Sequence, residues 1–242
     1  MRYGIFSDVH SNIDALQAVV KAYKKEAIDA YFCVGDVVGY AANPIECINE
    51  VRRLTKATIV GNHDRASIDL LSSNYFNPVA AQAIAWTKDH LDNKDRAFLQ
   101  SLKFVYQDED LTLVHGTLAT PEDFSYMVDY YSARETFLLL KTPVCFLGHT
   151  HVASAFIKAE GDTISYSALG EITIEGSCRY IINVGSVGQP RDSNPHAAYG
   201  IYDTKTKVVE IKRVAYDIQA TRNRIADAGL PRFLGDRLLV GR

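Results

Sequence analysis

Five short apolar segments of this chain run directly into residues that can bind a metal ion. Each segment is rich in the β-branched, aromatic or aliphatic side chains of strands, and Asp, His or Asn follows where the strand pattern stops. The clusters are Asp8 with His10, Gly35 with Asp36, Gly61 through Asp64, His115 with Gly116, and Gly148 through His151. A fold for this sequence must therefore account for metal-binding side chains at the end of one strand after another.

The first part of the chain alternates strand and helix patterns. Apolar runs at 2–6, 29–35 and 57–62 are typical of strands, and 12–26 and 44–54 carry apolar residues at helical spacing. This βαβαβ order predicts parallel strands joined by crossover helices. Ligand sites of open parallel sheets lie beyond the carboxyl ends of the strands, so the polar clusters are expected to converge there.

The rest of the chain adds a helical stretch and a series of further strands. Residues 65–102 contain no strand-like run and are expected to be helical in pieces. Further strands are expected at 103–107, 111–116 and 143–148, helices near 132–140 and 217–229, and hairpin-linked antiparallel strands from 152 to 213. Linkers and repeats do not stand out, so we expect one domain over residues 1–242, with a short helical insert at about 65–102.

The spacing and the type of the polar side chains predict a metal site. Residues two apart on an extended chain point to the same side, so Asp8 with His10, and His149 with His151, can each face one point. Imidazole, carboxylate and amide oxygen together suit Mn, Fe, Zn, Co or Ni, and are too rich in nitrogen for Ca or a typical Mg site. Two ions about 3.5–4 Å apart with a bridging carboxylate would use every candidate. The candidates are Asp8, His10, Asp36, Asn62, His115, His149 and His151.

The alternative is that these histidines are structural. A single His at the end of a strand is more often a hydrogen-bonded residue of the core than a ligand. Five of the seven histidines fall in the strand-end clusters, however, and only His90 and His196 lie elsewhere. Chance placement explains that concentration poorly, and we favour the metal site.

Charge and composition narrow the class of partner. The net charge of −3 supplies little counterion-release energy, so no nucleic-acid polymer is expected to bind. The chain contains no run of about eighteen apolar residues, and we expect no membrane span. Because the first twelve residues show no charged leader, long apolar region or cleavage signal, the cytoplasm is the expected compartment.

Taken in order, the motifs D-x-H, G-D, G-N-H-D, H-G and G-H-x-H resemble those of the calcineurin-like metallophosphoesterases, in particular the compact prokaryotic members of phosphodiesterase type. The resemblance covers residues 5–152. It implies an α/β (α+β) fold in which two β-sheets form a sandwich flanked by helices (αββα), with a dinuclear metal site at the sheet edge. It also implies hydrolysis of phosphate esters by a water that both metals activate.

The resemblance further implies a role for each position. The residues are Asp8, His10 and His151 for the first metal, Asp36 as the bridge, and Asn62, His115 and His149 for the second. His63 would lie near the leaving group or the phosphoryl oxygens, as a proton donor or as a stabiliser of charge. No side chain of the protein would need to act as the nucleophile.

One motif departs from the family pattern. Where protein phosphatases and symmetrical dinucleotide polyphosphatases have G-D-x-x-D/A-R-G, this chain has Gly39 and Tyr40 at the acidic and arginine positions. The arginine that clamps phosphate and the carboxylate partner of His63 are both missing there, although Asp64 or another carboxylate could serve as the partner. Large phosphoprotein substrates are therefore less expected.

Two further segments could reach a substrate. The stretch NVGSVGQPRD at 183–192 resembles a turn of compact prokaryotic members, in which Gly185, Ser186 and Arg191 either approach the metals or form a purely structural turn; we take Arg191 as a candidate substrate-binding residue. Three aromatic residues of the insert either stack on a base or aryl group or pack in the core. They are Tyr75, Phe76 and Trp86.

These patterns predict a metal-dependent phosphoesterase that hydrolyses a small phosphodiester or nucleotide-like substrate. A terminal dianionic phosphate gains most from a bidentate arginine, so the missing clamp favours a diester. A phosphomonoesterase of the same fold is one alternative. The other is a non-catalytic metal-binding scaffold; such proteins usually lose ligands or His63, and here every position is kept.

Overall fold

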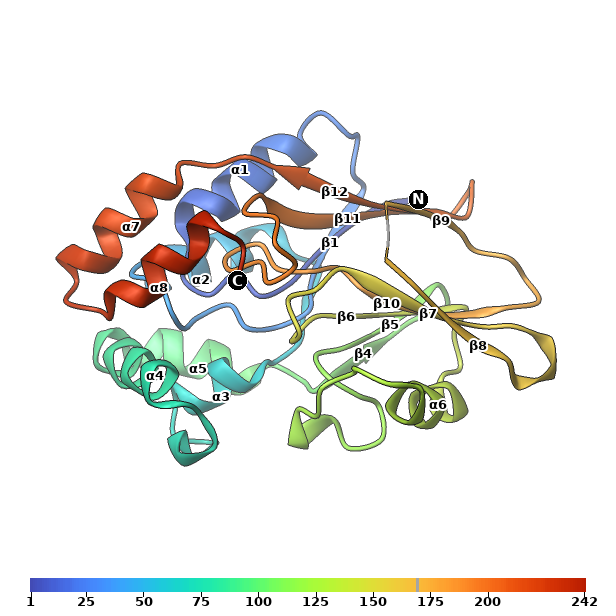
Figure 1. Cartoon of the computed structure of the whole chain (residues 1–242), viewed down its shortest axis with the longest axis horizontal. Helices are drawn as coiled ribbons and strands as arrows, with labels where there is room; N and C mark the ends of the chain where they lie inside the picture. The colour runs from blue at the N-terminus through green and yellow to red at the C-terminus, as the bar shows by residue number, and fades with distance from the viewer. Residues whose placement is uncertain (169) are drawn as a thin grey trace.

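The computed structural model describes residues 1–168 and 170–242, which form two six-stranded sheets packed face to face (Figure 1). In spatial order the first sheet contains β3 (Ala57–Thr58), β2 (Ala30–Cys33), β1 (Arg2–Phe6), β11 (Ala197–Asp203), β12 (Val208–Val214) and β9 (Glu171–Thr173). The second contains β4 (Val105–Gln107), β5 (Leu111–Val114), β6 (Val144–Leu147), β10 (Arg179–Asn183), β7 (Ser154–Lys158) and β8 (Ile164–Ser167). The predicted two-sheet sandwich is confirmed.

The parallel part of the first sheet is the predicted βαβαβ unit. Strands β1, β2 and β3 pair in parallel, and α1 (Ile13–Tyr23) and α2 (Pro44–Leu54) make the crossovers. Strand β11 pairs with β1 on the other side and runs antiparallel to it. The carboxyl ends of β1, β2 and β3 therefore meet at one edge of the sheet, as the sequence predicted.

The strands after residue 152 pair mostly antiparallel, as predicted, but they do not form one half of the fold, because they are divided between the two sheets. Strands β9, β11 and β12 complete the first sheet, whereas β7, β8 and β10 join the second. Strand β10 pairs in parallel with β6, and β6 pairs in parallel with β5. An alternating pattern specifies which face of a strand is buried, but it does not specify the neighbouring strand.

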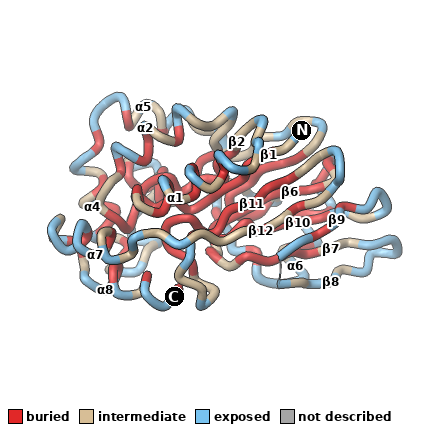
Figure 2. Tube along the Cα trace, turned by 90° about the horizontal axis from the view of Figure 1, so that it is seen from above, coloured by how far each residue is buried: buried red, intermediate tan, exposed pale blue. Residues whose placement is uncertain are grey.

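Apolar side chains fill the space between the sheets and beneath the helices, and Figure 2 shows the central strands β1, β6, β10 and β11 as largely buried. Between the sheets, Phe32 of the first and Phe146 of the second are fully buried. Helices α1 and α2 cover the outer face of the first sheet, and α6 (Tyr130–Leu139) covers that of the second. This rigid frame holds the strand ends in fixed positions.

The insert is helical in pieces, as predicted. Its helices are α3 (Asn62–Ala66), η1 (Ser73–Tyr75), α4 (Pro78–His90) and α5 (Asn93–Ser101). The predicted closing helix α7 (Ile218–Asp227) and α8 (Arg232–Asp236), which the sequence did not predict, share one apolar cluster with Ala80 and Ala83 of α4. The short turns η2 (Pro121–Asp123), η3 (Glu160–Asp162) and η4 (Arg237–Leu239) complete the helical elements of the described residues. None of these helices has the length and apolar character that crossing a membrane requires.

Candidate metal centre

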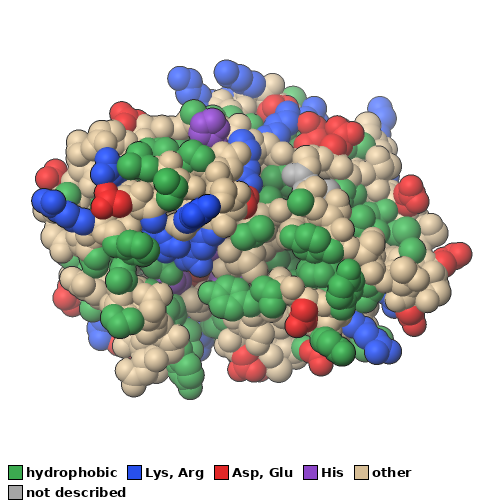
Figure 3. Space-filling model, viewed as in Figure 1, with side chains coloured by type: hydrophobic (Ala, Val, Ile, Leu, Met, Phe, Trp, Pro, Cys, Tyr) green, Lys and Arg blue, Asp and Glu red, His purple; other side chains and the backbone are tan. Residues whose placement is uncertain are grey.

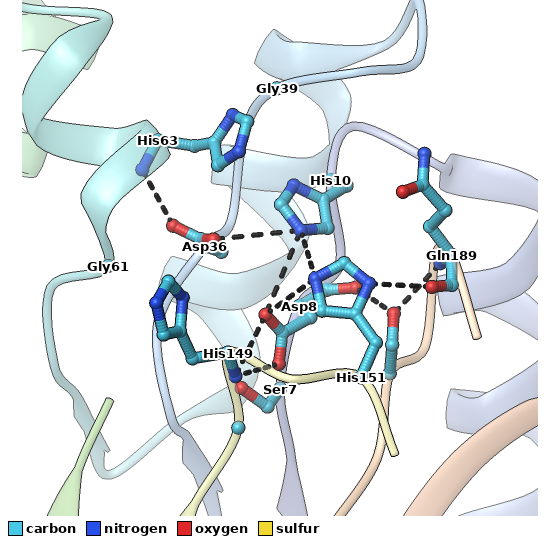
Figure 4. Close-up of polar contacts among 12 residues, drawn as sticks. Ser7, Asp8, His10, Asp36, Gly39, Gly61, His63, His149, His151 and Gln189 are labelled. Atoms are coloured by element: carbon cyan, nitrogen blue, oxygen red, sulfur yellow. Dashed lines mark hydrogen bonds and ion pairs between the residues drawn. The ribbon is translucent and has the colours of Figure 1, made fainter. Parts of the chain in front are cut away.

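Six of the seven predicted ligands form two adjoining groups of metal-binding atoms. Figure 4 shows Asp8, His10, Asp36, His149 and His151 among them. Within each group the ligand atoms all lie within 4.8 Å of one another. The first group is Asp8, His10, Asp36 and His151, and the second is Asp36, His115 and His149. The seventh candidate, Asn62, lines the same pocket as His149. The carboxylate of Asp36 is thus common to both groups, which is the place expected for a bridging ligand.

The first group is buried and closely spaced. The Nε2 atoms of His10 and His151 lie 3.0 Å apart. Oδ1 of Asp8 lies 3.7 Å from Nε2 of His10 and 3.2 Å from Nε2 of His151. Oδ2 of Asp36 lies 3.6 Å from Nε2 of His10. Two nitrogens and two carboxylate oxygens therefore face one point from three different segments of the chain.

In three histidines, a hydrogen bond at the ring nitrogen that points away from the centre determines which nitrogen faces it. The Nδ1 atoms of His10, His115 and His151 each lie within hydrogen-bond distance of a backbone carbonyl oxygen. The distances are 3.2 Å to Val38, 2.7 Å to Val34 and 2.6 Å to Gln189, respectively. Because Nδ1 carries the proton that it donates to the carbonyl, the lone pair of Nε2 is directed into the centre, as in histidines that bind metals.

Backbone groups orient the two carboxylates. The amide N–H of His149 donates to Oδ2 of Asp8 at 3.0 Å, and that of His63 donates to Oδ1 of Asp36 at 2.8 Å. The hydroxyl of Ser186 donates to the backbone carbonyl of Asp8 at 2.8 Å and so supports the same loop. Oδ2 of Asp36 accepts no hydrogen bond from the described residues, and it lies 3.6 Å from Nε2 of His10 in the first group and 3.3 Å from Nε2 of His115 in the second.

Three buried polar atoms in or beside the second group have no hydrogen-bond partner among the described residues: Oδ2 of Asp36, Oδ1 of Asn62 and Nε2 of His115. Oδ2 of Asp36 and Nε2 of His115 lie 3.3 Å apart. Such atoms are costly to bury without a partner. Burial alone would lower the pKa of His115, but the charges of Asp36 and Asp8 raise it to about 9. The group thus attracts positive charge, and its oxygen and nitrogen donors fit a divalent transition metal.

The backbone of the ligand loops is unusual. Five non-glycine ligands have positive φ angles: Asp8 (54°), His10 (49°), Asp36 (50°), His149 (65°) and His151 (62°). The left-handed conformation costs roughly 1–3 kcal/mol at such residues and is concentrated at functional sites. These φ angles also show that the paired residues are not on extended chain, because the chain leaves each strand and turns before it reaches them. The argument that residues two apart must point to the same side was therefore wrong here. His149 and His151 accordingly face different groups, and only Asp8 and His10 face the same one.

His63 lies beside the first group without a carboxylate partner. Its ring is 4.8 Å from that of His10 and 4.4 Å from that of Tyr40. Burial lowers the pKa of His63 to about 4. A Cβ atom at Gly39 would lie 2.7 Å from Nδ1 of His63, so this loop leaves no room there for the acidic side chain of the family pattern.

The sequence left open whether Asp64 is the carboxylate partner of His63, and the structure shows that it is not. Its carboxylate accepts the backbone N–H groups of Val38 at 3.1 Å and Gly61 at 2.9 Å. It therefore ties the loop after β2 to the start of α3. Nδ1 of His63 has no hydrogen-bond partner among the described residues.

Arg191 reaches the edge of the centre by way of Tyr40. Its guanidinium donates to the Tyr40 hydroxyl at 3.2 Å and to Oε1 of Gln189 at 2.9 Å. Its carbon Cζ also lies 5.7 Å from the centroid of the Tyr40 ring. Tyr40 occupies the arginine position of the family motif. The Arg191 guanidinium, which comes from a distant loop, therefore contacts the side chain that replaces the motif arginine.

The other two residues of the turn are structural. Ser186 is fully buried and bonds the loop of Asp8, and Gly185 packs against Ala198 in a left-handed conformation (φ 74°). Neither belongs to the two ligand groups. The structural alternative therefore describes Gly185 and Ser186, whereas the side chain of Arg191 contacts Tyr40 beside the first group.

A pocket of about 520 Å³ opens on the second ligand group and is lined by Asn62, His63 and His149 at its inner end. Tyr75 and Phe76 of the insert line it, as one alternative predicted. Trp86 does not; its ring stacks on His90 with the centroids 3.7 Å apart, and it packs with the cluster between α4 and α7.

Phe124 and Tyr126 also line the pocket, and the sequence did not single them out. They lie between β5 and α6, where no periodic pattern marked them, and their only signal was a pair of aromatic residues in a loop. Figure 3 shows one face of the molecule, in the view of Figure 1. On this face Lys and Arg side chains gather near the middle, above hydrophobic and acidic side chains.

The fold and the ligand set define a metal-dependent phosphoesterase. Residues 1–207 match the calcineurin-like phosphoesterase superfamily domain, and the chain belongs to this family, whose members use divalent metals. It is 38% identical over 243 residues to an uncharacterized protein of Methanocaldococcus jannaschii, with 98% of this chain and 97% of that protein covered.

Two solved structures have the same fold. The metallophosphoesterase from Sphaerobacter thermophilus is 38% identical, with all of both chains covered and a TM-score of 0.88. A hypothetical protein from Pyrococcus horikoshii is 19% identical, with 100% of this chain and 98% of that chain covered and a TM-score of 0.80. The expected family is therefore confirmed.

We expect Gly61→Ala to weaken metal binding, because a Cβ atom at Gly61 would overlap the Asp36 carboxylate. Changes to residues that orient a metal ligand typically lower affinity roughly 10- to 100-fold. Titration with Mn²⁺, followed by elemental analysis of the bound metal, measures the loss. Gly176→Ala is the control, since a Cβ there meets nothing within 4 Å. Equal Mn²⁺ affinity of the two variants would contradict the role given to Gly61.

Proposed function

We propose that this protein is a phosphodiesterase that hydrolyses a small phosphodiester or nucleotide-like substrate with two divalent transition-metal ions. The observation that carries the proposal is the pair of ligand groups that share Asp36 beside a pocket of about 520 Å³. If a phosphate binds between the two groups, next to the Asp36 carboxylate that they share, the pocket has room for one of its ester arms. Mn, Fe, Zn, Co and Ni all suit the donor set.

The proposed roles follow the two groups. The residues are Asp8, His10 and His151 for the first ion, Asp36 as the bridge, and Asn62, His115 and His149 for the second. When bound, two such ions activate a water as the nucleophile and neutralise charge on the phosphate. The chain's own part is to hold each Nε2 and carboxylate oxygen in place through the backbone hydrogen bonds described above.

His63 is the proposed catalytic side chain. It lines the pocket together with Asn62 and His149, and this supports a position in which its imidazole would lie near an ester oxygen of a phosphate held between the two groups. With a pKa lowered to about 4 its imidazole is neutral near pH 7, so there it can donate an N–H hydrogen bond to the leaving oxygen or stabilise charge on the phosphoryl oxygens. To donate a proton it would first have to gain one as the negative charge of the bound phosphate raises its pKa. The rings of Tyr40 and Phe76, at 4.4 and 4.9 Å, hold it in position in place of a carboxylate.

Arg191 is the proposed substrate-binding cation. Its contacts with Tyr40 and Gln189 keep the guanidinium at the edge of the first group, where it can bond a non-bridging phosphate oxygen. The same residue also favours the alternative activity, a phosphomonoesterase, since an arginine at this place could bind a terminal phosphate. We favour the diester because the adjoining pocket can hold an ester arm. A non-catalytic scaffold would not need His63 or Arg191 in these positions.

We expect the protein with Mn²⁺ to hydrolyse bis(p-nitrophenyl) phosphate with a higher kcat/KM than p-nitrophenyl phosphate. One nitrophenyl arm of the diester can enter the pocket, whereas the protein lacks the motif arginine that would bind the dianionic phosphate of the monoester at two points. Paired kinetics at the same metal concentration make the comparison. A clear preference for the monoester would establish the phosphatase instead, and inactivity with Mn²⁺, Fe²⁺, Zn²⁺, Co²⁺ and Ni²⁺ alike would favour the scaffold.

We expect His63→Ala to slow turnover roughly 10²- to 10⁴-fold, the contribution typical of a general acid or base, while the protein keeps its metal. Asp36→Asn should impair both, because it weakens the ligand common to the two groups. Turnover and metal content are measured on the same samples. If both variants lost metal equally, His63 would not have the separate role proposed here.

We expect Arg191→Gln to lower kcat/KM for the diester roughly 10- to 100-fold, mainly through KM, because a charge-assisted hydrogen bond to phosphate is lost. Tyr40→Phe should have a smaller effect in the same direction, since it frees the guanidinium from its hydroxyl partner. Arg179→Gln, on the exposed start of β10, is the matched control. An unchanged KM in Arg191→Gln would exclude Arg191 as a substrate-binding residue.

A further inference from the structure

The pocket beside the second ligand group has a composition that restricts what it can bind. We propose that it selects phosphodiesters in which one ester arm carries a flat aromatic ring without negative charge. This inference rests on the proposed phosphodiesterase activity and names the substrate class of the same site. Three features carry it: two exposed tyrosines, a stacked pair at the inner end, and an acidic rim.

The two tyrosines come from different segments and line the same pocket. Tyr75 belongs to η1 of the insert and is 82% exposed, and Tyr126 follows η2 and is 52% exposed. Other tyrosines, such as Tyr131 and Tyr166, are also exposed, so the relevant feature is that these two line one pocket and face a common space. Because the rest of the lining includes Phe76 and Phe124, an arm that enters the pocket meets aromatic rings from both segments.

The ring of Tyr126 is already oriented for stacking. It lies on the imidazole of His149 with the ring centroids 4.1 Å apart and the planes inclined by only 12°. His149 is buried, so this contact fixes the plane of the tyrosine while half of its surface stays exposed. Because the tyrosine ring is already held in this plane, stacking of a planar ring on it costs the protein little further side-chain conformational entropy.

The charges of the pocket exclude a second anionic group. Glu122 and Asp123 of η2 line the rim and are exposed, and none of the described lining residues is Lys or Arg. Arg191 lies behind Tyr40, at the end where the phosphate is bound in the proposed function. Arg191 therefore attracts negative charge at the phosphate end, whereas Glu122 and Asp123 repel negative charge along the ester arm. Arms with an amide, an amine or a cation fit the rim, whereas polyphosphate or carboxylate arms do not.

A series of methyl phosphodiesters tests the inference with Mn²⁺-loaded full-length protein. The second arm is cyclohexyl, 4-carbamoylphenyl, 4-(aminomethyl)phenyl or 4-carboxyphenyl. Intrinsic leaving-group reactivity differs among these compounds, so the quantity compared is the ratio of kcat/KM between wild type and each variant for one substrate at a time. Product formation is followed by chromatography.

The aromatic part is tested with Tyr126→Ala and Tyr75→Ala. Each should lower kcat/KM for the carbamoylphenyl ester about tenfold more than for the cyclohexyl ester, because only the planar arm loses a stacking contact. Tyr75→Ala guards against an indirect effect on the metal, because Tyr75 makes no ring contact with a ligand among the described residues. Tyr166→Ala is the matched control, since Tyr166 is 51% exposed on β8 and does not line the pocket.

The acidic part is tested with the double variant Glu122→Gln/Asp123→Asn. It should raise kcat/KM for the carboxyphenyl ester about threefold, lower it for the aminomethyl ester by a similar factor, and leave the carbamoylphenyl ester unchanged. Increasing ionic strength should reduce both shifts. Glu160→Gln is the control, because Glu160 is an exposed acid in the first turn of another 3-10 helix, η3.

The outcomes separate the two proposals. If wild type cleaves none of the four diesters, the proposed function fails and this inference fails with it. If wild type cleaves the diesters but the tyrosine variants affect aryl and cyclohexyl esters equally, or the acidic double variant affects all charges alike, only the substrate class is overturned. Selective losses for aryl arms together with the charge-dependent shifts support it.

Discussion

The carboxylate of Asp36 is the contact on which the rest of the centre depends. One oxygen is held by the amide of His63, and the other faces both ligand groups. Gly61 has no side chain because one would overlap that carboxylate, and Asp64 joins the loops on either side through two backbone N–H groups. The loop after β2 and the start of α3 are thus shaped around the one carboxylate that the two groups share.

This arrangement is stabilised by its surroundings and not by local preference. Asp8, His10 and Asp36 adopt left-handed conformations that cost roughly 1–3 kcal/mol each. Buried donors and acceptors without protein partners add to that cost. The packed sheets and the buttress from Ser186 hold the loops in place, and binding of a cation would satisfy the unpaired atoms. Function and stability therefore oppose each other at the centre, as is common at catalytic sites.

Much of the fold could be predicted because its signals are local. The βαβαβ unit follows from apolar runs and helical spacing, and Asp, His and Asn at strand ends indicated which edge would carry the site. The prediction failed where neighbours had to be chosen. Strands β9 and β11 lie in the first sheet, while β10 between them in sequence lies in the second, since alternation describes a buried face and not a partner.

The sequence by itself determined the chemical type of the centre, since ligand identity and order are properties of the residues and follow the family motifs. Only the tertiary structure decided how these residues are used. It separated His149 from His151, gave Asp64 to backbone amides, and brought Arg191 to Tyr40 across 151 positions of chain. Such contacts depend on loop conformations set by distant packing, and a pattern of neighbouring residues carries no information about them.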